Sequence, residues 1–268
     1  MSAPRRHASV LTIAGSDSGG GAGIQADLKT FAAFDLHGLS AITAVTAQNT
    51  RQIASSFCLP SKTVIAQIQA LFDDFDIRAV KIGMLGSAAN VDAVARTLVH
   101  VRAKNIVLDP VLIASSGMPL LAPQGLLAMR RNLLPIVDVL TPNLPEAETL
   151  LGRRLANANA RRAAARELIG CGPKAVLLKG GHAQGAHVSD YLAHASGESE
   201  LRHPRLPIRA HGTGCVLSAA IAAGLALDRP LRDAVADAEE FLRDALVHSY
   251  RAGKGAPRVL CLARRFHD

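Results

Sequence analysis

The sequence contains no tryptophan, and aromatic residues make up only 3% of its 268 residues. A hydrophobic core must therefore be built from aliphatic side chains and alanine, which keep the hydrophobic fraction at 49%. With charged residues at 19%, this composition is typical of a globular protein rather than a disordered chain. The shortage of aromatics also counts against nucleic-acid binding, because single-stranded bases are commonly held by stacking on aromatic rings.

Long hydrophobic runs and paired cysteines are missing as well. No apolar stretch approaches the roughly 18 residues of a membrane-spanning helix, and the run over 10–14 is too short for a signal peptide. We therefore expect a cytoplasmic protein with no membrane partner. The four cysteines show no Cys-x-x-Cys spacing, so neither a zinc site nor a disulfide framework is indicated.

The excess of positive charge is spread along the chain. The formal net charge is +8, but the arginine pairs at 130–131, 153–154 and 161–162 stand far apart. This scatter favours solvated helix faces over a nucleic-acid surface, although some of the charge could attract a polyphosphate substrate.

Short apolar runs of β-forming residues alternate with helical segments along most of the chain. We expect strands over residues 9–14, 39–47, 79–83, 106–108, 137–140 and 175–178, and a hairpin-like segment near 188–209. Helices are expected over 22–34, 61–75 (with Ser61 as N-cap), 87–103, 123–134, 145–151, 158–169, 214–227 and 231–249. Repeated β-α-β units predict a three-layer α/β/α fold with a mostly parallel central sheet. We expect a single domain over 1–268, with tails at 1–7 and about 256–268.

The segment His-Gly-Thr-Gly-Cys at 211–215 precedes an alanine-rich run that is typical of a buried helix. The N-terminus of a helix carries unpaired backbone N–H groups, and two glycines allow an anion to approach them closely. The segment therefore predicts an oxyanion or phosphate site. Cys215 falls in the first turn, where the helix field is expected to lower its pKa towards neutrality. The alternative is a backbone turn followed by a small core cysteine.

Polar and glycine residues also gather where the other predicted strands end. In parallel sheets these carboxyl ends share one edge, where ligands bind. Five glycines lie between Gly15 and Gly23, which favours a loop that approaches a ligand over a mere turn. The remaining strand-end residues are Gln48-Asn49, Gly83-Met84, Asp109-Pro110, Asn143 and Lys179-Gly180-Gly181.

Two of these strand-end residues, and Glu146 at the start of the following helix, could contact a phosphate or its metal. Asp109 and Glu146 offer carboxylates of the kind that bind Mg²⁺, and Lys179 could act as a point charge on a phosphate. The alternative for Asn143 and Glu146 is a helix N-cap with an acidic first turn, which is common.

Seven motifs, in order, resemble those of hydroxymethylpyrimidine/phosphomethylpyrimidine kinases, a family of the ribokinase-like superfamily. They occupy residues 14–31, 43–50, 81–86, 108–111, 141–148, 179–182 and 211–215, within a match that spans about 8–250. The resemblance implies ATP-dependent phosphorylation of 4-amino-5-hydroxymethyl-2-methylpyrimidine and then of its monophosphate, in thiamine biosynthesis. It also implies Mg²⁺ and a homodimer, and it leaves open a monovalent cation.

The resemblance also assigns roles to residues. The pyrimidine pocket would be formed by Gly15, Asp27, Gln48 and Met84. The metal would be held by Asp109 and Glu146, and the ATP phosphates by Lys179, Asn143 and Gly214. The transferring phosphoryl group would be held by the N–H groups of Gly212, Thr213 and Gly214, and Cys215 would be the base.

Two positions depart from the family pattern. Val216 stands where we expect threonine, and Ala210 stands where a polar residue is usual. Two alternatives therefore stay open: a pyridoxal-type kinase, and a non-catalytic protein that binds the pyrimidine as a sensor.

Overall fold

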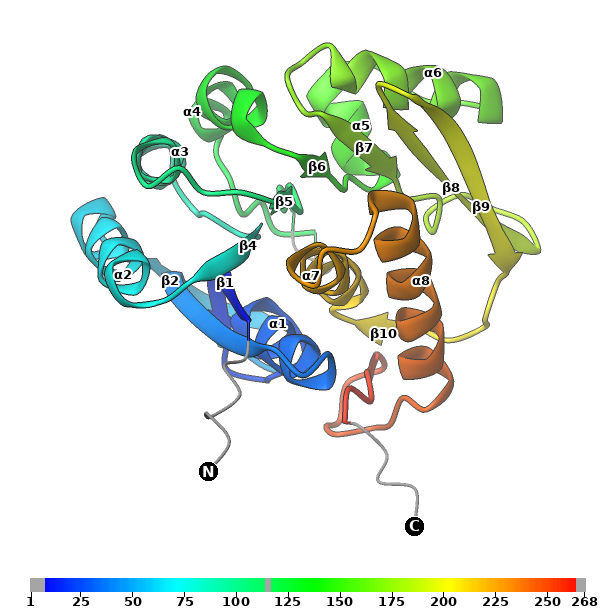
Figure 1. The fold of residues 1–268 in the computed structure, drawn as a ribbon. Helices are drawn as coiled ribbons and strands as arrows, with labels where there is room; N and C mark the ends of the chain where they lie inside the picture. The colour runs from blue at the N-terminus through cyan, green and yellow to red at the C-terminus, as the bar shows by residue number, and fades with distance from the viewer. Residues whose placement is uncertain (1–7, 114–116, 264–268) are drawn as a thin grey trace, which may run out of the picture.

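A computed structural model describes residues 8–113 and 117–263; the tail predicted at 1–7 lies outside these residues. Within them the chain forms a nine-stranded sheet with helices on both faces (Figure 1). The parallel strands lie side by side in the order β2 (His37–Gln48), β1 (Ser9–Asp17), β4 (Ile77–Ile82), β5 (Ile106–Leu108), β6 (Val139–Leu140) and β7 (Ala175–Leu178). The predicted three-layer α/β/α fold is thus confirmed.

Antiparallel strands complete both edges of the sheet. β3 (Ile53–Cys58) pairs with β2 at one edge. At the other edge, β7 pairs with β8 (His187–His194), which forms a hairpin with β9 (Gly197–Pro204). β8 and β9 fill the hairpin-like segment expected near 188–209, whereas β3 has no counterpart among the predicted strands.

Residues in the parallel strands alternate between two hydrophobic layers, as the period of a β-strand requires. Leu11 and Val80 belong to one layer, and their neighbours Val10 and Ala79 belong to the other. The first layer packs against α2 (Ser61–Asp74), α3 (Ala88–His100), α5 (Leu144–Leu151) and α6 (Ala158–Ile169). The second packs against α1 (Gly23–Ala33), α7 (Thr213–Ala226) and α8 (Leu231–Val247).

Helix α7 lies at the centre of the second layer, and its small side chains let its neighbours approach closely. A Cβ on Gly224 would lie 2.8 Å from the Cβ of Ala234 in α8, so that only glycine fits without displacing the neighbouring helix. Close packing on several sides holds the N-terminus of α7 in a fixed position above the sheet.

Two predicted helix boundaries need correction. The helix predicted over 123–134 is regular only in α4 (Pro123–Ala128) and continues as a wide turn (Met129–Leu133) and a 3₁₀ turn (Leu134–Ile136). Pro135 lacks an N–H group and its ring would crowd the carbonyl of Arg131 in a regular helix, so the segment before it cannot stay α-helical up to residue 134. Ser61 is not the N-cap of α2, because Pro60 occupies that position and no side chain caps it.

The segment from about residue 256 was expected to be a tail, but its described part belongs to the fold. β11 (Arg258–Val259) pairs with β10 (Ala210–His211), directly before α7. Leu260 and Leu262 are buried beside α7 and α8. Residues 264–268 lie outside the described part of the chain.

Replacing Leu260 by alanine is therefore expected to lower the free energy of unfolding by about 2–3 kcal/mol, because it leaves a cavity in a packed cluster. Urea unfolding of the variant measures this loss. An unchanged midpoint would contradict the packing role of the segment.

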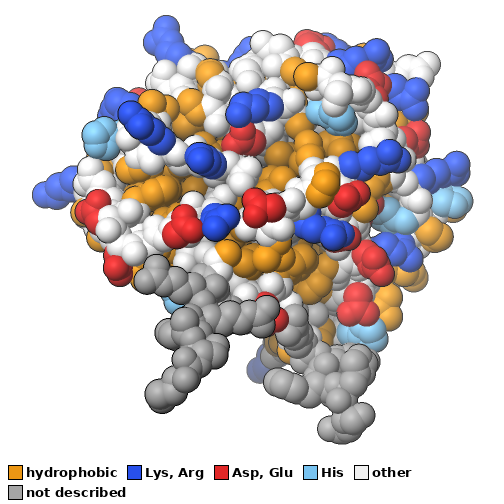
Figure 2. Space-filling view, in the orientation of Figure 1, with side chains coloured by type: hydrophobic (Ala, Val, Ile, Leu, Met, Phe, Trp, Pro, Cys, Tyr) orange, Lys and Arg blue, Asp and Glu red, His pale blue; other side chains and the backbone are white. Residues whose placement is uncertain are grey.

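The surface agrees with the scattered charge in the sequence. On the face seen in Figure 2, basic side chains lie among acidic and apolar ones and do not form one large patch. No helix in the described ranges is both long and apolar enough to cross a bilayer.

Candidate active site

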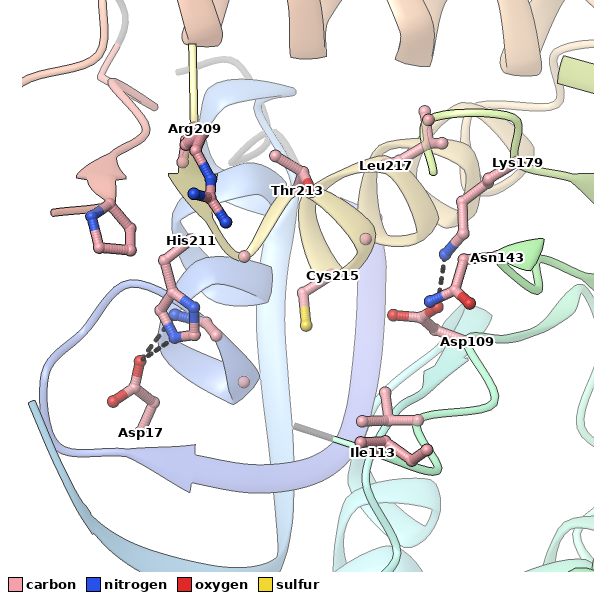
Figure 3. A pocket seen from close by; sticks show the side chains of 18 of the residues that line it. Asp17, Asp109, Ile113, Asn143, Lys179, Arg209, His211, Thr213, Cys215 and Leu217 are labelled. Atoms are coloured by element: carbon pink, nitrogen blue, oxygen red, sulfur yellow. Dashed lines mark hydrogen bonds and ion pairs between the residues drawn. The ribbon is translucent and has the colours of Figure 1, made fainter. Parts of the chain in front are cut away.

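A cavity of about 1260 Å³ opens at the carboxyl ends of the parallel strands (Figure 3). Residues at the ends of β1, β4, β5, β6 and β7 line it, together with the N-terminus of α7. Pockets for one small ligand usually measure about 300–1,000 Å³. This cavity therefore has room for two ligands that react with each other.

The N-terminus of α7 forms an anion site on one wall. Its N-cap, Gly212, has a φ of +80°, and a Cβ there would overlap the carbonyl oxygen of Gly21. No side chain caps this helix end, so the first N–H groups, at Thr213 to Cys215, remain available to a ligand that enters the cavity. Together with the helix dipole, they make this wall attractive to a phosphoryl group.

Lys179 and Asp109 lie directly beside this helix end. Lys179 Nζ is 2.8 Å from Asp109 Oδ1, and both side chains are largely buried. A Cβ on Gly214 would lie 3.2 Å from the Lys179 ammonium and 3.3 Å from Asp109 Oδ2. The anion site, a cation and a carboxylate thus meet at one place.

Asn143 and Glu146 form a capping box at the start of α5, so the helix-cap alternative describes their local structure. The N–H of Glu146 donates to Asn143 Oδ1 at 2.9 Å, and the N–H of Asn143 donates to Glu146 Oε2 at 2.8 Å. Burial, and Asp109 nearby, raise the pKa of Glu146 to about 7, although Lys179 opposes the rise.

Two buried carboxylates close to an anion site suit a divalent cation. Mg²⁺ is held by one or two protein carboxylates, by water and by phosphate oxygens. One oxygen of Glu146 accepts the capping bond, and one oxygen of Asp109 faces Lys179, which leaves a second oxygen on each. The donor set therefore fits the metal that the sequence implies.

Gly15, Gln48 and Met84 line the cavity at the end nearer to β1 and β2. A Cβ on Gly15 would lie 3.1 Å from the sulfur of Met84, so the thioether lies over this glycine. Gln48 lies at the end of β2 and faces His211. A flat ring could stack on the apolar Gly15–Met84 surface while the amide contacts its edge.

Asp27 is not among the residues that line the cavity, so its expected direct contact with the pyrimidine does not fit the structure. The side chain is fully buried and accepts from Lys81 Nζ at 2.8 Å and from the Thr12 hydroxyl at 2.6 Å. Lys81, by contrast, reaches the cavity. Burial acts to lower the pKa of Lys81, but the charges of Asp27, Cys215 and Asp109 and the hydrogen bond to Asp27 together outweigh it and raise the pKa above its usual value.

The expected thiol pKa near neutrality is wrong for Cys215. Burial raises the pKa of the thiol to about 11; Asp27 and Asp109 add to the rise, whereas Lys81 opposes it. The N–H of Gly23 also donates to the sulfur, but this bond does not reverse the shift. The protonated thiol is therefore the form that this site holds at neutral pH.

The departure at Val216 leaves the cavity unchanged. Its side chain is fully buried in the apolar cluster formed by Ala26, Ala245, Leu260 and Leu262. A hydroxyl group at this position would face that cluster rather than the anion site.

The fold and this arrangement of anion site, buried cation and carboxylates define a phosphotransferase of the ribokinase-like class. Residues 17–259 match the model of a family described as phosphomethylpyrimidine kinase. The chain is 47% identical over 251 residues to the hydroxymethylpyrimidine/phosphomethylpyrimidine kinase of Haemophilus influenzae. This match covers 92% of this chain and 93% of that protein. The chain belongs to the phosphomethylpyrimidine kinase family.

Solved structures agree with this assignment. The phosphomethylpyrimidine kinase of Clostridium difficile superimposes with a TM-score of 0.80 at 39% identity, over 89% of this chain and 99% of that one. The pyridoxal kinase of Staphylococcus aureus in complex with ADP gives a TM-score of 0.89 at 29% identity, over 98% and 97% of the chains.

Proposed function

We propose that this protein uses ATP to phosphorylate the hydroxymethyl oxygen of 4-amino-5-hydroxymethyl-2-methylpyrimidine, and then phosphorylates the monophosphate to the diphosphate used in thiamine biosynthesis. One observation carries the proposal: a single cavity has a ring-binding surface at one end and the anion site of α7 at the other. The name of the Haemophilus relative carries both activities. The lower identity to pyridoxal kinase gives that alternative less support.

At the ring end, the pyrimidine would stack on the surface formed by Gly15 and Met84, and Gln48 would contact its edge. An amide offers both a donor and an acceptor, which matches the 4-amino group and the neighbouring ring nitrogen. With the ring in this position, the hydroxymethyl group would point towards Cys215 and the start of α7, which line the same cavity.

At the phosphate end, the N–H groups of Gly212, Thr213 and Gly214 would hold the transferring phosphoryl group. Lys179 and Asn143 would hold the ATP phosphates, and Asp109 and Glu146 would hold Mg²⁺. The metal, when bound, neutralises charge on the phosphate oxygens. Phosphoryl transfer relies mainly on positioning and charge stabilisation, and these groups supply both.

Cys215 would take the proton from the hydroxymethyl oxygen onto its sulfur. With a thiol pKa of about 11, only a small fraction of the protein carries the thiolate at neutral pH. A small fraction can suffice because the transition state is loose and the O–H bond breaks late.

Incubation with Mg·ATP and the hydroxymethylpyrimidine, followed by mass spectrometry over time, tests the proposal. We expect the monophosphate first and the diphosphate after it. The monophosphate alone would limit the protein to one step. Binding of the pyrimidine with no product would favour the sensor.

A pH profile tests the role of the thiol. Below the thiol pKa of about 11, the thiolate fraction rises roughly tenfold per pH unit, so the single-turnover rate of the first phosphorylation should rise similarly between about pH 6.5 and 9. The second step should stay nearly flat above about pH 7, because its phosphate acceptor is already ionised. Two parallel profiles would contradict Cys215 as the base.

The homodimer and the cytoplasmic location stay predictions. Sedimentation of the purified protein would decide the first, and fractionation of cells the second.

A further inference from the structure

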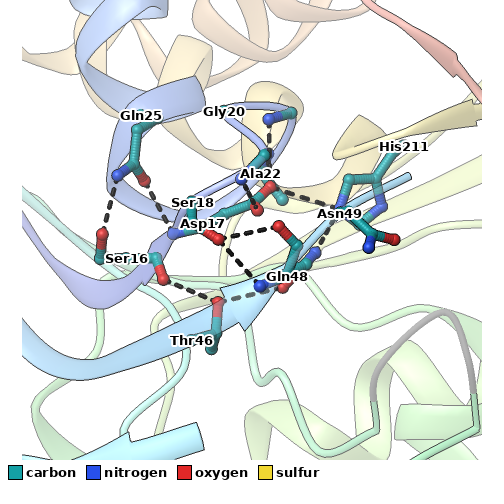
Figure 4. A network of polar contacts seen from close by, with 12 residues as sticks. Ser16, Asp17, Ser18, Gly20, Ala22, Gln25, Thr46, Gln48, Asn49 and His211 are labelled. Atoms are coloured by element: carbon teal, nitrogen blue, oxygen red, sulfur yellow. Dashed lines mark hydrogen bonds and ion pairs between the residues drawn. The ribbon is translucent and has the colours of Figure 1, made fainter. Parts of the chain in front are cut away.

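A network of polar contacts connects the pyrimidine end of the cavity to the start of α7 (Figure 4). It includes His211, which directly precedes the N-cap of α7 and has no role in the mechanism above. The inference that follows rests on the proposed function, because it concerns how Gln48 reads the pyrimidine.

Asp17 is the fixed acceptor of this network. Its buried carboxylate accepts from the N–H groups of Gly19 (2.8 Å), Gly21 (3.0 Å) and Ala22 (2.9 Å). Burial acts to raise the pKa of Asp17, but the hydrogen bonds from His211 and from these backbone groups lower it overall. Asp17 is therefore ionised at neutral pH and can only accept.

Thr46 decides how the amide of Gln48 is turned. Its hydroxyl oxygen lies 2.9 Å from the carbonyl oxygen of Ser16 and 3.3 Å from the Gln48 amide atom that the structure draws as Oε1. The hydroxyl has one proton, and the shorter contact to a carbonyl takes it. Towards Gln48 the hydroxyl can then only accept, so the amide NH₂ must face Thr46 and the amide oxygen must face His211.

His211 meets the other side of the same amide. Its Nε2 lies 2.8 Å from the Gln48 amide atom drawn as Nε2 and 3.5 Å from Asp17 Oδ2. Both partners are then acceptors, so Nε2 must carry a proton. The opposite amide orientation, which Figure 4 draws, would place an unprotonated nitrogen against the Asp17 carboxylate and leave no proton between Thr46 and Gln48.

We propose that His211 is a positioning residue that locks the Gln48 amide and thereby sets which pyrimidine edge the protein accepts. In the locked orientation, Gln48 keeps one N–H and one oxygen lone pair for the substrate. These match the acceptor nitrogen and the donor amino group of a 4-aminopyrimidine. A reversed amide would match a 4-oxopyrimidine, in which donor and acceptor are exchanged.

The ring of His211 is itself held in place by the glycine loop. A Cβ on Gly21 would lie 3.0 Å from His211 Cδ2, and a Cβ on Gly212 would overlap the carbonyl oxygen of Gly21. Gly21 therefore contacts both His211, which holds the Gln48 amide, and Gly212, the N-cap of the anion site.

The experiment compares 4-amino-5-hydroxymethyl-2-methylpyrimidine with its 4-oxo analogue, by kcat/KM and by calorimetric binding without ATP. His211→Ala should narrow the preference for the amino compound at least about tenfold, because the amide can then turn. His211→Gln keeps an N–H donor at about the same distance from the backbone. Its preference for the amino compound should stay within about threefold of that of the parent protein.

Two further variants guard against a general structural effect. Thr46→Val removes the other partner of the amide and should also narrow the preference, and the double variant should lose little more than the larger single loss. His182→Ala alters another histidine of the cavity wall, one without a hydrogen bond to Gln48 in the described part of the chain, and it should leave the preference unchanged.

Long-range ¹H–¹⁵N spectra of the unliganded full chain provide a test that needs no substrate. We expect a proton on His211 Nε2 at neutral pH, and an unprotonated Nε2 would overturn the proposal. An unchanged preference in His211→Ala would overturn it as well. If the parent protein makes no product but His211→Ala still narrows the binding preference, the positioning role is upheld and the proposed kinase activity is refuted.

Discussion

Replacing Cys215 by alanine is expected to lower kcat for the hydroxymethyl substrate by about 10²–10⁴, the usual range for a lost general base. The N–H groups at the start of α7 remain in the variant, so ATP binding should change little. Rapid-quench measurement of one turnover separates this effect from product release.

The loss should be much smaller with the monophosphate as substrate, because its acceptor oxygen carries no proton to remove. Cys171→Ala serves as the control, since this cysteine is also half-buried but lies outside the cavity wall. Near-normal turnover of Cys215→Ala, or equal losses with both substrates, would refute the base assignment.

Replacing Lys81 by methionine should lower the free energy of unfolding by about 3–5 kcal/mol, because it leaves the buried Asp27 carboxylate without its cation. One oxygen of Asp27 already has no hydrogen-bond partner in the described structure, so little remains to compensate the charge. Urea unfolding followed by circular dichroism measures the loss.

The double variant Asp27→Asn/Lys81→Met removes both charges and should recover most of that stability. The exposed pair Arg153–Glu167 provides a contrast: Arg153→Met should cost no more than about 1 kcal/mol. Equal losses of unfolding free energy at the two sites would show that burial does not decide how much the Lys81–Asp27 pair contributes to stability.

The regular elements of the fold could be predicted because their side chains follow one period. The helix Ala158–Ile169 and the strand Ala175–Leu178 have the predicted bounds. β3 was missed because most of its residues are exposed, so it lacks the apolar alternation of a half-buried strand. β10 and β11 have two residues each and depend on contact between distant segments, which sequence patterns do not reveal.

In the candidate site, too, some residues could be predicted from the sequence and others could not. Strand-end residues such as Asp109 and Lys179 could be predicted to meet, because parallel strands share one edge. Lys81 was missed as a cavity residue, although a lysine inside the apolar run of a buried strand is a signal of function. The contacts of His211 with Asp17 and Gln48 join distant segments, and no spacing predicts them.

The thiol of Cys215 shows why a local pattern can give the wrong sign. The charge of Lys81 and the hydrogen bond from the Gly23 N–H do favour a thiolate. Burial and the carboxylates of Asp27 and Asp109 act in the opposite direction and prevail. Those two carboxylates come from other segments, so their effect appears only in the folded chain.

The pairing of β10 with β11 also bears on the order in which the protein becomes active during synthesis. The turn proposed to hold the phosphoryl group follows β10, and β10 is paired by a strand that leaves the ribosome later. The sheet and most of its helices can form before that strand emerges. A nascent chain could therefore fold and bury most of its core while β10, just before the proposed phosphate site, still lacks its paired strand, so catalytic competence would come after folding of most of the core.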